Sequence, residues 1–93
     1  MEIRLNESDS KGFAIAKEDA KQAGIMTYSM AGPTLLIIDH TEVGPQFNGK
    51  GLGQQLLYKI VEMARDKNKK IIPLCPFAAK MFKKLDDIRD VLH

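Results

Sequence analysis

The segment with the clearest chemical potential is a glycine-rich turn at residues 44–51, Gly-Pro-Gln-Phe-Asn-Gly-Lys-Gly. It lies between an apolar run at residues 35–38 and a helical pattern that begins at Leu52. A strand that ends in such a turn and opens a helix directs several backbone N–H groups and the positive end of the helix dipole toward one point. Glycine also lets phosphate oxygens approach the backbone closely and permits positive φ. The turn therefore predicts a binding site for an anion.

Three side chains near the turn could take part in catalysis. His40 and Glu42 lie two residues apart at the end of the predicted strand, so we expect both on one face, with Asp39 on the other. Imidazole groups change charge near neutral pH and suit the role of a base, whereas a carboxylate needs burial or a water relay. Cys75 precedes Pro76 at the expected start of a helix, where the dipole favours thiolate. Each of the three could also be an ordinary structural residue, Cys75 as a small buried side chain.

Two nucleotide-binding motifs resemble the turn, but the sequence lacks a residue that each motif requires. Residues 44–50 fit G-x-x-x-x-G-K, but Gly51 replaces the Ser or Thr that holds magnesium in a P-loop. The only later strand candidate ends in Leu74-Cys75 and not in a metal-binding acid. A dinucleotide fingerprint counted from Gly49 has Gln54 in place of its third glycine.

The elements around the turn predict an α+β fold. Alternating apolar residues predict three short strands near residues 3–5, 13–15 and 25–30, which form an antiparallel meander. The continuous apolar run at 35–38 predicts a strand covered on both faces, near the centre of the sheet. A helical stripe at 52–64, a short strand at 71–74, a helix at 77–84 and a last helical turn at 86–93 follow.

The overall composition indicates one domain over residues 1–93, with 44% apolar residues and a single cysteine. No apolar run is long enough to cross a bilayer, and the N-terminus begins directly with a strand pattern, so we expect a cytoplasmic protein without membrane contact. A lone cysteine excludes a multi-cysteine metal site, and we expect no bound metal. Residues 1–48 and 49–93 carry net charges near −3 and +5. The few aromatic residues and the absence of a nucleic-acid module nevertheless argue against a nucleic-acid partner.

The residues of the turn also resemble a family motif. Gln46-x-x-Gly49-x-Gly51 is similar to the R/Q-x-x-G-x-G/A motif of the GNAT superfamily of N-acetyltransferases, and the strand, helix and later strand around it match that family's order. Residues 40–43 (His-Thr-Glu-Val), 49–53 (Gly-Lys-Gly-Leu-Gly) and 73–78 (Pro-Leu-Cys-Pro-Phe-Ala) resemble a short branch of single domains of about this length. The resemblance covers roughly residues 12–92.

This resemblance implies a compact GNAT-like fold with a parallel-paired final strand, and acetyl-CoA as the cofactor. The final strand then diverges from the strand before the turn, and the pantetheine arm enters between them. Pro73 lacks an N–H, so we expect its ladder neighbour to be absent. The implied catalytic residues are His40, Glu42 and Cys75. The implied amide donors are those of residues 43, 44 and 47–53. The implied cofactor-binding residues are Val43, Gly44, Phe47, Asn48, Gly49, Lys50, Gly51, Leu52, Gly53, Cys75 and Phe77.

Two departures from the family limit the hypothesis. The helix after the last strand offers Phe77 and Phe82 but not the tyrosine that protonates the leaving thiolate in many members of the family. The general acid is therefore unassigned: Cys75 or a water could substitute, or the transfer is slow. The family's two N-terminal helices are not visible in residues 11–31, so the acceptor site is open or completed by another chain. We predict an acetyl-CoA-dependent N-acetyltransferase acting on an amine of a small molecule, peptide or protein, as a monomer or weak homodimer. The alternative is a non-catalytic or redox coenzyme A-binding module that uses Cys75.

Overall fold

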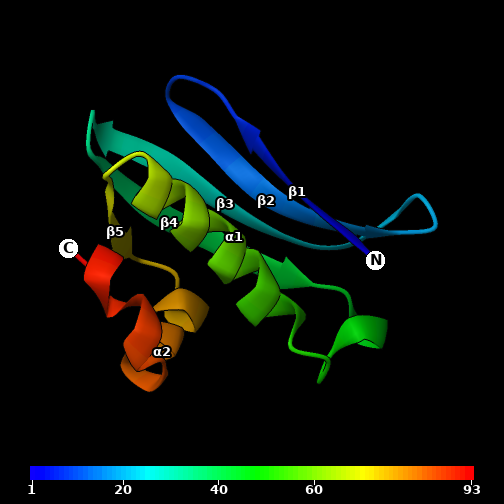
Figure 1. The fold of residues 1–93 in the computed structure, drawn as a ribbon. Helices are drawn as coiled ribbons and strands as arrows, with labels where there is room; N and C mark the ends of the chain where they lie inside the picture. Colours follow the sequence, from blue (N-terminus) through cyan, green and yellow to red (C-terminus); the bar gives the residue numbers. More distant parts are fainter.

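A computed structural model describes all residues, 1–93, as a sheet with helices packed against it (Figure 1). Four of the five strands come before the first helix in the chain. The strands are β1 (Glu2–Glu7), β2 (Lys11–Glu18), β3 (Lys21–Gly32), β4 (Leu35–Val43) and β5 (Lys70–Pro73). The helices are α1 (Leu52–Asp66) and α2 (Pro76–Lys84), with 3₁₀ turns η1 (Pro45–Phe47) and η2 (Asp86–Val91). No helix has the length and apolar character that a membrane span requires.

The sheet confirms the predicted α+β topology. β1 to β4 pair in sequence order as an antiparallel meander, and β5 pairs with β4 in parallel. A parallel neighbour needs a crossover connection, and α1 supplies it. Figure 1 shows α1 lying across the sheet, with α2 beside β5. The glycine-rich turn is thereby placed where β4 ends and α1 begins.

The helices cover only one face of the sheet. Ala14, Met26, Leu36 and Ile38 are fully buried there in one core with the apolar stripe of α1. Their neighbours on the other face are only partly buried; these include Phe13, Ile15, Ile25, Leu35 and Ile37. The prediction that residues 35–38 are covered on both faces is therefore wrong, because α1 and α2 belong to the same core cluster. We call the uncovered side the open face.

The parallel pairing of β4 and β5 is short. It covers four residue pairs and ends at Ile38 and Pro73. The N–H groups of Leu74 and Cys75 then both donate to the carbonyl oxygen of Ile38, at 3.2 and 3.0 Å. The expectation that Pro73 has no ladder neighbour is wrong, because Pro73 pairs with Ile38. The two strands separate at the next residue. β4 continues to Val43 without a β5 partner, and we call this separation the β4–β5 gap.

An irregularity in β4 reorients Asp39. Thr27 pairs with His40 and Tyr28 pairs with Ile38, so Asp39 is an extra residue without a partner, as in a β-bulge. Its carboxylate accepts a hydrogen bond from the Oγ of Ser29 at 2.6 Å. Thr27 and Ser29 are two residues apart and therefore lie on the same face of β3. Thr27 is the partner of His40 and Ser29 contacts Asp39, so Asp39 lies on the same face as His40. The predicted opposite orientation is wrong because strict alternation fails at a bulge.

Polar contacts fix the C-terminal segment to α1. Arg65 donates to both carboxylate oxygens of Asp90, at 2.9 and 2.7 Å, and this contact holds the pKa of Asp90 below its ordinary value. The hydroxyl of Tyr58 donates to Asp87 at 2.7 Å, and this hydrogen bond raises the pKa of Tyr58. Between these contacts Ile88 is fully buried. The segment therefore packs against both α1 and α2.

We predict that Ile38→Ala destabilises the fold much more than Ile37→Ala. Both residues lie in β4, but only Ile38 is fully buried under the helices. Removing the buried side chain should lower the free energy of unfolding by about 3 kcal/mol, whereas truncation on the open face should cost about 1 kcal/mol. Urea denaturation of the two variants measures both values. Equal losses would contradict a one-sided core.

Candidate functional site

A cavity of about 470 Å³ lies where the end of β4, the glycine-rich turn and the two helices meet. Thr41 and Val43 line it from β4, and residues 47–49 and 51–54 line it from the turn and the first turn of α1. Phe77, Met81 and Lys84 close it from α2. The cavity therefore unites most of the residues that the sequence predicted for the cofactor, although Gly44, Lys50 and Cys75 do not line it.

The start of α1 offers unpaired backbone donors to this cavity. The N–H groups of residues 49–54 make no hydrogen bond within the protein, and the first backbone bond runs from Gln55 to Gly51 at 3.1 Å. Gly49 and Gly51 have φ of 79° and 70°, a left-handed conformation that favours glycine. This turn aims consecutive N–H groups outward at the positive end of a 15-residue helix. The arrangement suits a phosphate or diphosphate group.

Three of the predicted amide donors are already engaged. The N–H of Gly44 donates to Ala23 at 2.9 Å, that of Phe47 to Gly44 at 2.9 Å and that of Asn48 to Pro45 at 3.3 Å. The 3₁₀ turn η1 consumes the last two, so these amides do not offer free donors. Phe47 and Asn48 still line the cavity with other atoms. The backbone N–H groups that remain free at this turn are those of residues 49–54.

Gly53 serves packing and not a special backbone conformation. It lies inside α1 and lacks a positive φ, unlike Gly49 and Gly51. A Cβ at this position would lie 2.5 Å from the ring of Phe77. Gly53 therefore lets the aromatic ring of α2 rest against the first turn of α1.

Two lysines lie near the cavity. The Nζ of Lys50 lies 5.9 Å from the ring centroid of Phe47, so the ring holds the ammonium close to the turn. Lys84 lines the cavity from α2. The sequence analysis missed Lys84, although Phe77, Met81 and Lys84 follow the i, i+4, i+7 spacing of one helix face. Met81, Thr41 and Gln54 were also missed, although Thr41 and Gln54 flank residues that were predicted.

Cys75 lies behind the cavity wall on the helix side of β4. Its Sγ is 3.2 Å from the Oγ1 of Thr41, and only 4% of the residue is exposed. Cys75 caps the N-terminus of α2, as the sequence predicted. The thiol therefore joins β4 to α2 across the β4–β5 gap. No group of three or more His, Cys, Asp or Glu side chains forms a metal site.

His40 and Glu42 lie on the other side of the same strand. The Nε2 of His40 is 4.0 Å from the Oε2 of Glu42, and both side chains are largely exposed on the open face. Their pairing on one face confirms the period-two expectation. Thr41 and Cys75 occupy the opposite face, so the predicted catalytic residues are divided between two sides of β4. Because β5 has ended at this level, the edge of β4 between the two faces has no strand partner.

Sequence comparison identifies the family. Residues 12–91 match the model of the GCN5-related N-acetyl-transferases. The chain belongs to this family. No protein of curated function matches the chain by sequence. Membership accounts for the order of strand, glycine turn, helix and parallel strand that frames the cavity.

Solved structures share the GNAT fold. A GCN5-like protein from Staphylococcus aureus, solved by NMR, is 33% identical with a TM-score of 0.74, over 97% of this chain and 87% of that one. The ribosomal-protein-alanine N-acetyltransferase of Brucella melitensis biovar Abortus 2308 is 17% identical, with a TM-score of 0.71, over 84% and 62%. A GNAT acetyltransferase from Elizabethkingia anophelis with acetyl-CoA bound is 23% identical, with a TM-score of 0.62, over 69% and 42%. The chain spans less than two thirds of the last two proteins, and these two show the fold alone.

We predict that Gly53→Ala fails to gain the stability that alanine normally brings to a helix. The new Cβ meets the Phe77 ring, so the free energy of unfolding should fall by about 1 kcal/mol. At an unobstructed helix position the same substitution would raise it by a similar amount. In a Phe77→Leu background the same substitution should become stabilising, because the ring is gone. Urea denaturation of the double-mutant cycle measures the coupling. Gln55→Ala, at an exposed position of the same turn, is the matched control.

Proposed function

We propose that the protein is an acetyl-CoA-dependent N-acetyltransferase that binds the diphosphate of coenzyme A at residues 49–54. The observation that carries the proposal is the set of free N–H groups at the start of α1, directly beside the β4–β5 gap. A protein of the same fold from Elizabethkingia anophelis was solved with acetyl-CoA bound, which makes this compound the first ligand to test.

The residues present fit the parts of this cofactor. Free amides and the nearby ammonium groups of Lys50 and Lys84 suit a diphosphate. The unpaired edge of β4 beyond Ile38 offers backbone groups to the amides of a pantetheine arm, as an added strand would be paired. Phe77 and Met81 supply apolar contacts along the cavity wall. When bound, acetyl-CoA supplies an activated thioester carbonyl.

On the open face, His40 is the base in this proposal. Its imidazole accepts a proton from the attacking amine, and Glu42 at 4.0 Å stabilises the imidazolium that results. An exposed pair at the β4–β5 gap is accessible to an acceptor that approaches from the uncovered side of the sheet. Thr41 and Cys75 lie on the other side of β4, where the thiol of Cys75 can donate a proton to a departing sulfur and the hydroxyl of Thr41 can stabilise the resulting Cys75 thiolate by a hydrogen bond.

A redox role for Cys75 is the weaker alternative. Only 4% of Cys75 is exposed, and its sulfur already contacts Thr41. A mixed disulfide with coenzyme A would require this contact to open. Mass spectrometry of the purified protein with and without reductant tests the alternative directly, because a coenzyme A adduct that is lost on reduction would favour it.

We predict that Lys84→Glu weakens acetyl-CoA binding about tenfold, because a charge that lies at the cavity changes sign. Lys83→Glu is the matched control: it makes the same change in the neighbouring residue of α2, which borders a different surface cavity. Isothermal titration calorimetry at low ionic strength measures both dissociation constants. The difference should shrink in high salt, where screening weakens exposed charges. Equal binding by both variants would exclude Lys84 from the phosphate site.

We predict that His40→Gln lowers kcat by about a hundredfold or more while acetyl-CoA binding is retained, because only proton removal is lost. A thiol-release assay with a panel of amines and peptides gives the rates, and calorimetry gives the binding. His93→Gln, at the far end of the chain, is the control for removal of a histidine. Unchanged turnover in His40→Gln would remove it from the mechanism.

A further inference from the structure

The open face carries a row of four side chains that crosses four strands. Each is the cross-strand partner of the next, so the four lie side by side. The members are Arg4 of β1, Ile15 of β2, Ile25 of β3 and Glu42 of β4. The row runs from a cation through two apolar side chains to a carboxylate, and neither α1 nor α2 covers it (Figure 1). We call it the charged row.

The two charged ends of this row have free binding capacity. The side chains of Arg4 and Glu42 are 70% and 72% exposed. Arg4 donates to Glu2 through Nε at 2.7 Å, and its two Nη groups make no hydrogen bond within the protein. The carboxylate of Glu42 has only the 4.0 Å contact to His40. Three strand spacings, about 14 Å, separate the two ends, so they cannot pair within one chain.

The middle of the open face is apolar. Phe13, Ile15 and Ile25 are partly buried on β2 and β3. Ile37 and Ile72, a cross-strand pair, continue the apolar surface on β4 and β5. Side chains of this kind are stabilised when a second surface removes them from water. Two sheets that bury such faces pack with their strands nearly aligned, as in a β-sandwich. The open face therefore suits a second sheet.

A second copy of the chain supplies a complementary sheet. A two-fold axis parallel to the strands, between β2 and β3, places β1 of one copy over β4 of the other and β2 over β3. Because the members of the charged row share one level, Arg4 then faces the partner's Glu42, and Ile15 faces the partner's Ile25. The symmetry repeats both contacts on the other side of the axis. An axis across the strands places each strand over itself, so both arginines lie at one edge and both carboxylates at the other. Only the first axis pairs opposite charges.

We propose that the open face is a self-association surface, on which two copies of the chain pack face to face with Arg4 of each copy paired to Glu42 of the other. The apolar middle stabilises the dimer, and the charged row sets its orientation. His40 lies two residues before Glu42 on the same face, so the dimer covers it. A second copy and an acetyl acceptor therefore compete for the open face, a consequence that rests on the proposed function. The self-association does not rest on that function.

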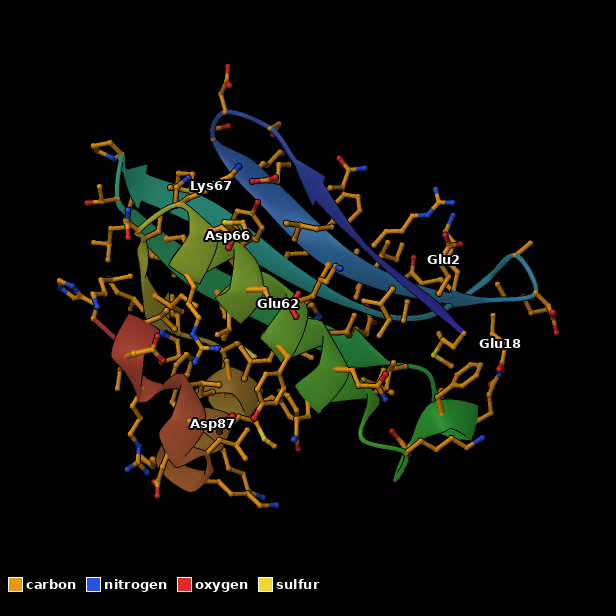
Figure 2. All side chains as sticks on the ribbon, in the orientation of Figure 1. Glu2, Glu18, Glu62, Asp66, Lys67 and Asp87 are labelled. Carbon is orange, nitrogen blue, oxygen red and sulfur yellow. The ribbon has the colours of Figure 1, made fainter.

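Sedimentation of the wild-type protein should show a reversible monomer–dimer equilibrium as its concentration rises from micromolar to millimolar. Arg4→Glu and Glu42→Arg should each weaken self-association at least about tenfold, because like charges then meet at both symmetry-related contacts. An equimolar mixture of the two variants should restore the dimer, because opposite charges meet again at both contacts of a mixed pair. Glu62→Arg is the matched control, since Glu62 is an exposed residue of α1 on the helix side of the sheet (Figure 2).

The inference is overturned if the wild type stays monomeric at every concentration, if either variant self-associates as tightly as the wild type, or if the mixture does not restore the dimer. Amide signals of ¹⁵N-labelled protein give a second measurement. Those of Ile15, Ile25 and Glu42 should shift on dilution, and a shift confined to other residues would also overturn the inference. Addition of acetyl-CoA tests the proposed function separately, because that function fails if the signals of residues 49–54 stay unchanged. The two failures are therefore distinguishable.

Discussion

β4 and β5 can pair over only four residue pairs, and the arrangement of the site depends on this limit. Pro73 has no N–H to extend the ladder, and the next two N–H groups both turn back to the carbonyl of Ile38. The chain then leaves the sheet and starts α2. β4 continues alone, so its last residues keep an unpaired backbone edge. A continuous parallel pair would have closed that edge.

The packing of α1 determines where the free backbone N–H groups lie. Ala14 and Ala16 occupy the sheet surface below the helix, and these small side chains allow a close approach. At Gly24 a Cβ would lie 3.2 Å from Leu52, so the first turn of α1 rests almost on the backbone of β3. The connection from β4 must therefore turn sharply. It does so with positive φ at Gly49 and Gly51, and the same turn exposes the N–H groups of residues 49–54.

Local patterns were sufficient for the elements and for the position of the glycine turn. The spacing of apolar residues predicted α1, and its start beside the glycines was correct. Pro76 correctly marked the first turn of α2, with Cys75 as its cap. These features depend on backbone propensity and on near neighbours in the chain, which a sequence shows directly. Even so, Lys84 was missed, because its place at the cavity depends on the packing of α2 against α1.

The sequence by itself determined the strand order, the glycine turn and the residue types available for acyl transfer. Tertiary structure decided that only one sheet face is covered, that Gly53 accommodates an aromatic ring, and that Asp39 faces the same side as His40. The physical reason is that these features arise from contacts between segments distant in the chain. A bulge in β4 exists only relative to the register of β3, and no periodicity within β4 records it.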